Sequence, residues 1–227
     1  MSASIEIKQF LLGPMENYCY VISDSVSKEA IIVDPAWDIE TVKNYLEENS
    51  LKLKGYFVSH YHPDHCGGHL WGHDIPGVAE FLEFIAAPIL CHKDELEGLH
   101  KITGIEKKEF KTLASGDTIN LGDHTIKGIH TPGHTPGSMC LLVDGQSLFA
   151  GDTLFINGCG RVDLPGGSAE QLYDSLQNKL MKLPGSTILF PGHAYAPQKN
   201  ATFHEILQLN PFLKNLENKD EWIKIRS

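Results

Sequence analysis

Four apolar, strand-like runs in this 227-residue chain each lead into a loop that carries a histidine or an aspartate. The runs are GYFVS, TIKGIH, SLFAG and TILFP, and the polar residues in their loops are His60, His134, Asp152 and His193. Loops that leave rigid strands at one edge of a sheet are a common framework for a site. The pattern therefore favours a fold in which four strands, far apart in the sequence, end close together.

The first half of the chain mixes strand and helix signals. SIEIKQF, YCYVIS and EAIIVDP read as strands, and the polar turn DSVSK joins the last two. Asp38 is a capping residue for a helix that runs to about Glu48. After the GYFVS strand we expect a helical region between Gly67 and about Leu99, interrupted by two prolines.

The second half has the same mixture. HTIKGIH reads as a strand, and SMCLLV and SLFAG form a hairpin around the turn pair Asp144-Gly145. Ser168, with Gln171 three residues later, starts a helix, and TILFPGH follows as a buried strand. Alternating strands and helices indicate an α/β or α+β fold.

The stretch HYHPDH holds three histidines and an aspartate within six residues. His60 and His62 are two apart on extended backbone, so both side chains project to one side and can share an ion. Pro63 fixes the backbone and turns the chain, so Asp64 and His65 leave in another direction. A polar surface loop is the alternative explanation, but two metal sites that receive further ligands from the other strand ends account for the spacing better.

Composition excludes several classes of protein. The formal net charge is −10, and no cluster of lysine or arginine suggests a nucleic-acid surface or an anionic-membrane patch. No apolar run reaches the roughly 18 residues of a membrane span, and the N-terminus lacks signal-peptide character. Five scattered cysteines without a C-x-x-C pair suit a reducing compartment, so we expect a cytoplasmic protein.

HYHPDH, TPGHTPGS, GDTLF and PGHAY, in this order, resemble the metallo-β-lactamase-fold hydrolases, and specifically their glyoxalase II (hydroxyacylglutathione hydrolase)-like branch. The resemblance spans about residues 5–211. It implies an α/β fold of the four-layer αββα sandwich type and a dinuclear metal site. Carried over residue by residue, one ion is bound by His60, His62 and His134, the other by Asp64, His65 and His193, and Asp152 bridges them.

The resemblance also implies an activity. Two divalent ions, zinc first and iron or manganese as alternatives, share a hydroxide that attacks a thioester of the S-acylglutathione type, and Asp64 acts as the catalytic residue that orients it. The segment GCGR, which ends at Arg161, is similar to a stretch of glyoxalase II and persulfide dioxygenases that contacts glutathione, so the resemblance implies that Arg161 binds a substrate carboxylate. Tyr195 resembles a substrate-contacting tyrosine of glyoxalase II. The expected partner is therefore a small molecule, with no nucleic acid and no membrane.

One departure from glyoxalase II concerns the C-terminus. We expect a single domain over residues 1–227, in which a short tail from about residue 197 replaces the longer helical domain that grips glutathione in that family. Other activities of the fold stay open. GCGRVDLPGG also looks like persulfide dioxygenases, in which His60, His134 and Asp152 would hold one iron, and a lactonase or phosphodiesterase is a further alternative.

Two secondary expectations concern residues near the motifs. Asp34, at the end of the strand EAIIVDP, is placed to brace the loops of the site. His130, four residues before His134, belongs to a strand end and is expected to support the site rather than to bind metal directly.

Overall fold

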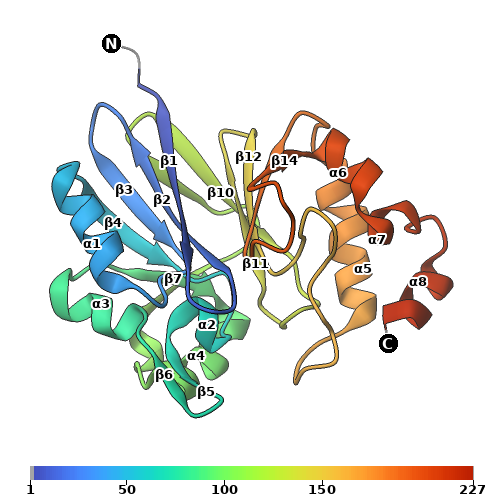
Figure 1. Cartoon of the computed structure of the whole chain (residues 1–227), viewed down its shortest axis with the longest axis horizontal. Coiled ribbons are helices and arrows are strands. Elements are labelled where there is room, and N and C mark those ends of the chain that lie inside the picture. The colour runs from blue at the N-terminus through green and yellow to red at the C-terminus, as the bar shows by residue number, and fades with distance from the viewer. Residues whose placement is uncertain (1–2, 227) are drawn as a thin grey trace.

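Two six-stranded sheets packed face to face form the centre of the protein (Figure 1), as seen in a computed structural model that describes residues 3–226. The first sheet runs in the order β1 (Ile5–Leu12), β2 (Asn17–Asp24), β3 (Glu29–Val33), β4 (Lys52–Phe57), β7 (Ile89–His92) and β8 (Phe110–Leu113). The second runs in the order β14 (Ala201–Thr202), β13 (Ile188–Pro191), β12 (Ser147–Gly151), β11 (Met139–Val143), β10 (His124–His130) and β9 (Thr118–Leu121).

Helices cover the outer face of each sheet (Figure 1). On the side of the first sheet lie α1 (Ile39–Glu48), α2 (Pro63–Cys66), α3 (Val78–Phe84) and α4 (Leu96–Thr103). On the side of the second lie α5 (Ala169–Asn178), α6 (Phe203–Leu209), α7 (Pro211–Lys214) and α8 (Lys219–Arg226). Three short 3₁₀ helices span Lys93–Glu95, Lys107–Glu109 and Leu180–Lys182. The predicted four-layer αββα sandwich is confirmed.

Alternation along the strands creates three apolar layers. In β2, Tyr20 faces the core between the two sheets, whereas Val21 faces the helices on the outside. In β11, Leu141 likewise faces the other sheet and Leu142 faces α5. Because successive side chains of a strand point to opposite faces, continuous apolar runs of this kind are typical of strands buried on both sides.

Several local predictions are confirmed. Asp38 caps α1, since its Oδ1 accepts a hydrogen bond of 3.0 Å from the Thr41 backbone N–H. Ser168 caps α5 in the same way through the Gln171 N–H. β11 and β12 form the expected antiparallel hairpin around Asp144-Gly145.

The helical region predicted from Gly67 to about Leu99 is only partly correct. Its first eight residues after Gly67 form a two-stranded hairpin of β5 (Gly68–Leu70) and β6 (His73–Ile75), and β7 adds a strand to the first sheet. Helix is confined to α3 and the beginning of α4. Pro76 and Pro88 lie outside helices, directly after β6 and directly before β7. A positive φ at Trp71 and Gly72 allows a tight turn that apolar periodicity did not reveal.

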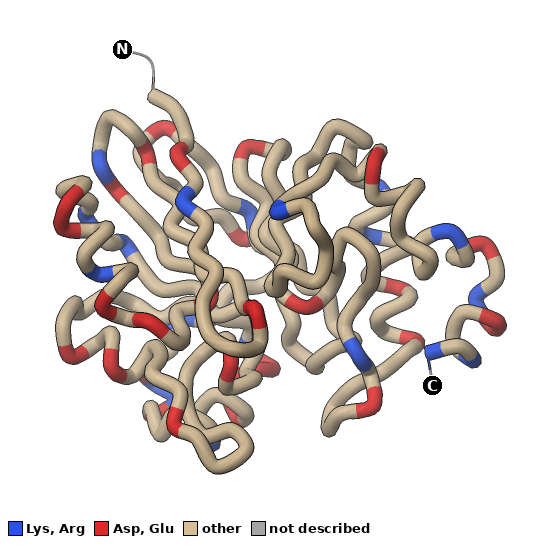
Figure 2. Tube along the Cα trace, in the orientation of Figure 1, with Lys and Arg blue, Asp and Glu red and all other residues tan. Residues whose placement is uncertain are grey.

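The tail that begins near residue 197 packs against the second sheet. Trp222 of α8 and Leu213 of α7 join the same apolar cluster as Leu172 and Leu176 of α5. Lysine and arginine are interspersed with acidic residues along the trace (Figure 2). Among the described residues, no helix has the length and apolar character needed to cross a membrane.

Candidate metal centre

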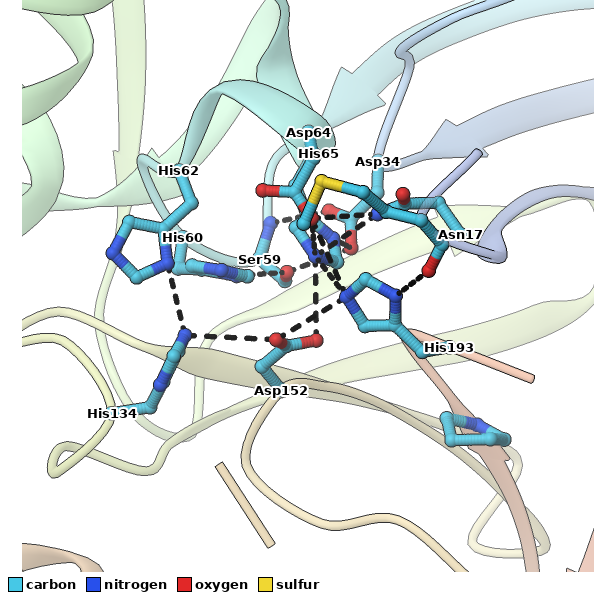
Figure 3. A network of polar contacts seen from close by, with 12 residues as sticks. Asn17, Asp34, Ser59, His60, His62, Asp64, His65, His134, Asp152 and His193 are labelled. Carbon is cyan, nitrogen blue, oxygen red and sulfur yellow. Dashed lines mark hydrogen bonds and ion pairs between the residues drawn. The ribbon is translucent and has the colours of Figure 1, made fainter. Parts of the chain in front are cut away.

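The seven predicted ligands lie together at one edge of the sandwich (Figure 3). They come from four loops, after β4, β10, β12 and β13, as the strand ends predicted. The backbone ties two of these loops to strands of the opposite sheet, because Tyr18 N–H of β2 donates to Gly192 O at 2.8 Å and Met139 N–H of β11 donates to Ser59 O at 3.0 Å. The edges of both sheets are thereby joined where the polar side chains meet.

One group of nitrogen donors consists of His60, His62 and His134, whose ligand atoms all lie within 4.8 Å of one another. His134 Nε2 lies 3.0 Å from His62 Nδ1, and the His60 ring centroid lies 4.7 Å from that of His134. Figure 3 shows the three rings around a common point. Three imidazoles in this arrangement match the protein ligand set of a tetrahedral ion with one open position.

A second group consists of Asp64, His65 and His193. The Nε2 atoms of the two histidines are 3.1 Å apart, and Asp64 Oδ2 lies 3.3 Å from His65 Nε2 and 3.4 Å from His193 Nε2. The Pro63 turn starts α2, and Asp64 and His65 direct their ligand atoms toward His193. The His65 ring still lies close to His60, with 4.2 Å between the two ring centroids.

Asp152 lies between the two groups. Its Oδ1 is 3.3 Å from His65 Nε2, and its Oδ2 is 3.4 Å from His193 Nε2 and 3.7 Å from His134 Nε2. A carboxylate within 3.7 Å of ring nitrogens from both groups occupies the position of a bridging ligand.

Backbone carbonyls orient two of the rings. His134 Nδ1 lies 2.8 Å from Arg161 O, and His193 Nδ1 lies 2.9 Å from Met15 O. Because a carbonyl oxygen only accepts, each Nδ1 carries the proton and each Nε2 presents its lone pair to the centre.

Asp34 and Ser59 orient two more rings. Asp34 Oδ2 lies 2.9 Å from His65 Nδ1 and accepts the Ser59 hydroxyl at 2.8 Å, while Ser59 Oγ lies 3.0 Å from His60 Nδ1. The expectation that Asp34 braces the site is confirmed. Sequence patterns did not indicate Ser59, although its position directly before the HYHPDH stretch was available as a signal.

Asn17 and Trp37 support Asp64, and nothing in the sequence indicated them. Asn17 Nδ2 donates to Asp64 Oδ2 at 2.9 Å, and the Trp37 indole N–H donates to Asn17 Oδ1 at 3.0 Å and to Asp64 O at 3.1 Å. Asn17 comes from β2 and Trp37 from the loop before α1, so the contact depends entirely on how these elements pack.

The donor set fits a pair of divalent cations. His60 is 1% exposed, and its Nε2 has no hydrogen-bond partner among residues 3–226. The Oδ1 of Asp152 is likewise buried without a hydrogen bond from the described residues. Buried polar atoms need a partner, and imidazole nitrogen with carboxylate oxygen suits zinc, iron or manganese. Cations between these atoms would satisfy them.

The pKa shifts agree with binding of positive charge. Burial, followed by the neighbouring His134, lowers the pKa of His62 to about 4, so its ring is neutral and able to coordinate. Burial by itself would raise the pKa of Asp152, but the attraction of His193 and His65 holds that pKa well below its usual range. The pKa values of His60 and His134 are lowered in the same way, so the first group presents neutral imidazoles. In the second group Asp64 and Asp152 raise the pKa values of His65 and His193, and a bound cation would displace the protons of those two rings.

A cavity of about 570 Å³ opens above the centre. The two predicted substrate residues both line it. The Tyr195 ring stacks on His193 at 4.6 Å and 7°, and 47% of Tyr195 is exposed. The Arg161 guanidinium is paired with Asp163 by hydrogen bonds of 2.7 and 2.6 Å. Most of the remaining wall is apolar, with Met15, Leu70, Trp71, Phe155 and Leu164.

A further cluster of His92, Asp94 and His130 lies outside this centre. The rings of His92 and His130 are stacked 3.8 Å apart at 11°, so their lone pairs lie in parallel planes and do not converge on one ion. His130 bonds to Pro136 O at 2.9 Å in the loop that carries His134. Its predicted supporting role is consistent with that contact.

The fold and the cluster of buried histidines and carboxylates define a metal-dependent enzyme of the αββα class. Residues 12–193 match the family model of the metallo-beta-lactamase superfamily. The chain belongs to that superfamily, whose members are metal-dependent hydrolases and related enzymes.

Three curated relatives cover most of the chain. A probable polyketide biosynthesis zinc-dependent hydrolase, PksB of Bacillus subtilis, is 30% identical over 93% of this chain and 87% of its own length. Hydroxyacylglutathione hydrolase of Dictyostelium discoideum is 32% identical over 92% of this chain and 74% of its own. The mitochondrial persulfide dioxygenase ETHE1 of Mus musculus is 30% identical over 98% and 81%. The similarity to the glyoxalase II branch is confirmed, and it is shared with other activities.

Proposed function

We propose that the chain is a thioester hydrolase that uses two metal ions. The observation that carries the proposal is the presence of two complete ligand groups on either side of Asp152. His60, His62 and His134 would hold one ion, and Asp64, His65 and His193 the other. When bound, such ions acidify a shared water and polarise the carbonyl that it attacks.

The chain's own residues then position the reaction. Asn17 holds Asp64 with its carboxylate beside His65 and His193, so Asp64 can orient the attacking water. The apolar walls exclude bulk water from the reacting carbonyl, and this strengthens the electrostatic interactions within the cavity.

The leaving group favours a thioester over an amide. Apart from the seven proposed ligands, the cavity wall within the described residues offers Cys159, Arg161 and Tyr195 as titratable groups. Burial raises the pKa of Cys159 to about 11 and that of Tyr195 to about 12, and a guanidinium stays charged. None is a good proton donor near neutral pH. A thiolate leaves without prior protonation, whereas an amine does not.

The similarity to hydroxyacylglutathione hydrolase supports S-acylglutathione as a thioester to test first. Arg161 is the one arginine or lysine among the described residues of the cavity wall, and in this proposal it contacts a substrate carboxylate after exchanging its pairing with Asp163. The five cysteines are all unpaired and buried, which supports a reducing location such as the cytoplasm.

A persulfide dioxygenase is the second candidate, and the identity of 30% with ETHE1 over 98% of the chain favours it. In that case His60, His134 and Asp152 would hold one iron. The convergence of Asp64, His65 and His193 on a second point supports the dinuclear hydrolase instead. A lactonase or phosphodiesterase on the same fold ranks third.

One experiment separates these candidates. The protein is purified without added metal, zinc and iron per chain are measured, and thiol release from S-lactoylglutathione is compared with oxygen uptake on glutathione persulfide. Two ions per chain with thiol release are the expected result. One iron per chain with oxygen uptake would instead identify a dioxygenase.

The Asp64→Asn variant tests the mechanism. Because one carboxylate both supports an ion and orients the attacking water, we expect kcat to fall by about 10²-fold or more while the circular dichroism spectrum is unchanged. Asp123→Asn, at an exposed position, is the matched control and should leave kcat unaltered.

A further inference from the structure

The hairpin of β5 and β6 has an unusual residue at its tip. Leu70 pairs with His73, and the two residues between them, Trp71 and Gly72, have φ values of 50° and 83°. Two positive φ values define a type I′ turn, in which Asn-Gly is the favoured pair. A bulky tryptophan in the left-handed region is an outlier that costs free energy, and such outliers cluster at functional sites.

The position of Trp71 is as unusual as its backbone. It is 78% exposed, although burial of an indole is among the largest apolar contributions available to a protein. Trp71 lines the cavity above the metal centre, and it also lines a second hollow of about 570 Å³. The two hollows share Met15, Leu70 and Trp71.

The second hollow has an apolar wall. Besides the shared residues it is formed by Pro14, Trp37 and Ile75, with His73 and Asp74 at the hairpin strand. Neither lysine nor arginine lines it among the described residues. Its chemistry therefore fits an uncharged, apolar group and does not fit the carboxylates of a peptide-like thiol.

We propose that Met15, Leu70 and Trp71 form an acyl-chain subsite, so that the preferred substrates are thioesters of extended aliphatic acids. The inference rests on the proposed thioesterase function and adds the class of acyl group. The carbonyl lies at the metal centre, and the chain passes along the indole of Trp71 into the second hollow. The strain at Trp71 is retained because the indole gains its buried contact only when substrate is bound.

The test is a series of thioesters of one small neutral thiol, N-acetylcysteamine, from acetyl to decanoyl. A fully buried methylene raises kcat/KM by about fourfold. If each methylene is half buried, the octanoyl thioester should exceed the acetyl thioester by about 60-fold. Equal rates at all lengths would overturn the subsite and leave the hydrolase intact. Absence of cleavage at every length would overturn both proposals.

The Trp71→Asn variant tests the role of the indole without disturbing the turn. Asparagine is favoured at this turn position, so the melting temperature should be unchanged or higher. Removal of the indole re-exposes the equivalent of about two methylenes, so the octanoyl-to-acetyl ratio should fall by about 15-fold. Phe84→Ala is the control, because Phe84 is an aromatic residue of α3 that is 57% exposed and lines neither hollow, and the ratio should not change.

A binding measurement needs no turnover. Titration with the non-hydrolysable thioether S-decyl-N-acetylcysteamine should shift the tryptophan emission to the blue. The shift should be much smaller in Trp71→Asn, in which Trp37 is the one tryptophan that lines the second hollow among the described residues. An unchanged emission shift in the variant would overturn the proposal. The proposal would also be overturned if Trp71→Asn changed the sedimentation from dimer to monomer and left the octanoyl-to-acetyl ratio unaltered. The hairpin would then be an interface between copies of the chain.

Discussion

The Asp34→Asn substitution tests whether the orientation of His65 matters for metal binding, because it changes the hydrogen bond to this ligand and leaves the ligand in place. Asp34 is 4% exposed, and its φ of 52° lies in a region that aspartate and asparagine both tolerate, so the substitution preserves shape and backbone. Oδ1 accepts the Ser59 N–H at 2.8 Å, an interaction that the asparagine oxygen can keep. The new amide nitrogen then replaces Oδ2 beside His65 Nδ1, at 2.9 Å.

An amide nitrogen donates and cannot accept a proton from His65 Nδ1. The imidazole must therefore either lose this hydrogen bond or move its proton to Nε2, which is the atom that faces His193 and Asp152. Loss of such an orienting partner costs about 10- to 100-fold in metal affinity, which corresponds to about 1.4 to 2.7 kcal/mol. The loss should be larger for the ion held by His65, which Asp34 contacts directly. The ion held by His60, His62 and His134 should lose less affinity, because Asp34 reaches His60 only through the Ser59 hydroxyl.

Competition against a chromophoric zinc chelator measures the two affinities in one titration. The wild type should release two ions with separate midpoints, and Asp34→Asn should weaken one of them within the stated range. Asp123→Asn, an exposed carboxylate, is the control. Two affinities within twofold of the wild type, or an equal loss at both, would refute the reasoning that Asp34 acts through the tautomer of His65.

Three further predictions concern stability. Glu95, buried between the ligand loops, accepts hydrogen bonds from Tyr61 N, Thr135 Oγ1 and Gly137 N, and burial raises its pKa to about 7. A raised carboxyl pKa means that the folded state binds the extra proton, so the contribution of Glu95 to stability falls as the pH rises from about 4.5 to about 7. In urea titrations, the unfolding free energy of the wild type relative to Glu95→Gln should therefore fall by about 2 to 3 kcal/mol between pH 5 and pH 8. A difference that does not depend on pH would contradict this prediction. Metal at a thousandfold excess over its Kd stabilises the folded state by about 4 kcal/mol, so removal of the metal with a chelator should lower the melting temperature by about 10 °C. A melting temperature that calorimetry finds unchanged would count against the metal centre. Trp222→Ala should cost about 3 to 5 kcal/mol, because Trp222 is 1% exposed within the outer core and its indole donates to Phe212 O at 2.8 Å; a loss below 1 kcal/mol would mean that the tail is not part of the folded unit.

Local sequence was informative wherever a short pattern has one physical solution. The caps at Asp38 and Ser168, the turn at Asp144-Gly145 and the change of direction at Pro63 all follow from hydrogen bonding or φ limits within a few residues. The hairpin at Trp71 was missed because its sequence lacks such a pattern. Tryptophan is not a residue that signals a type I′ turn, so the local rule favoured helix.

What the sequence determined by itself is the four strands that lead into the site and the polar residue in the loop after each of them. Apolar runs specify strands buried on both faces, and a ligand placed directly after such a strand must emerge at the sheet edge. Which residues orient those ligands was decided only by the tertiary structure. Asn17 reaches Asp64 across 47 positions, and Met15 O meets His193 across 178. The first contact joins β2 to the loop after β4 at the edge of one sheet, and the second arises from the packing of one sheet on the other. No local periodicity records which distant segments will meet.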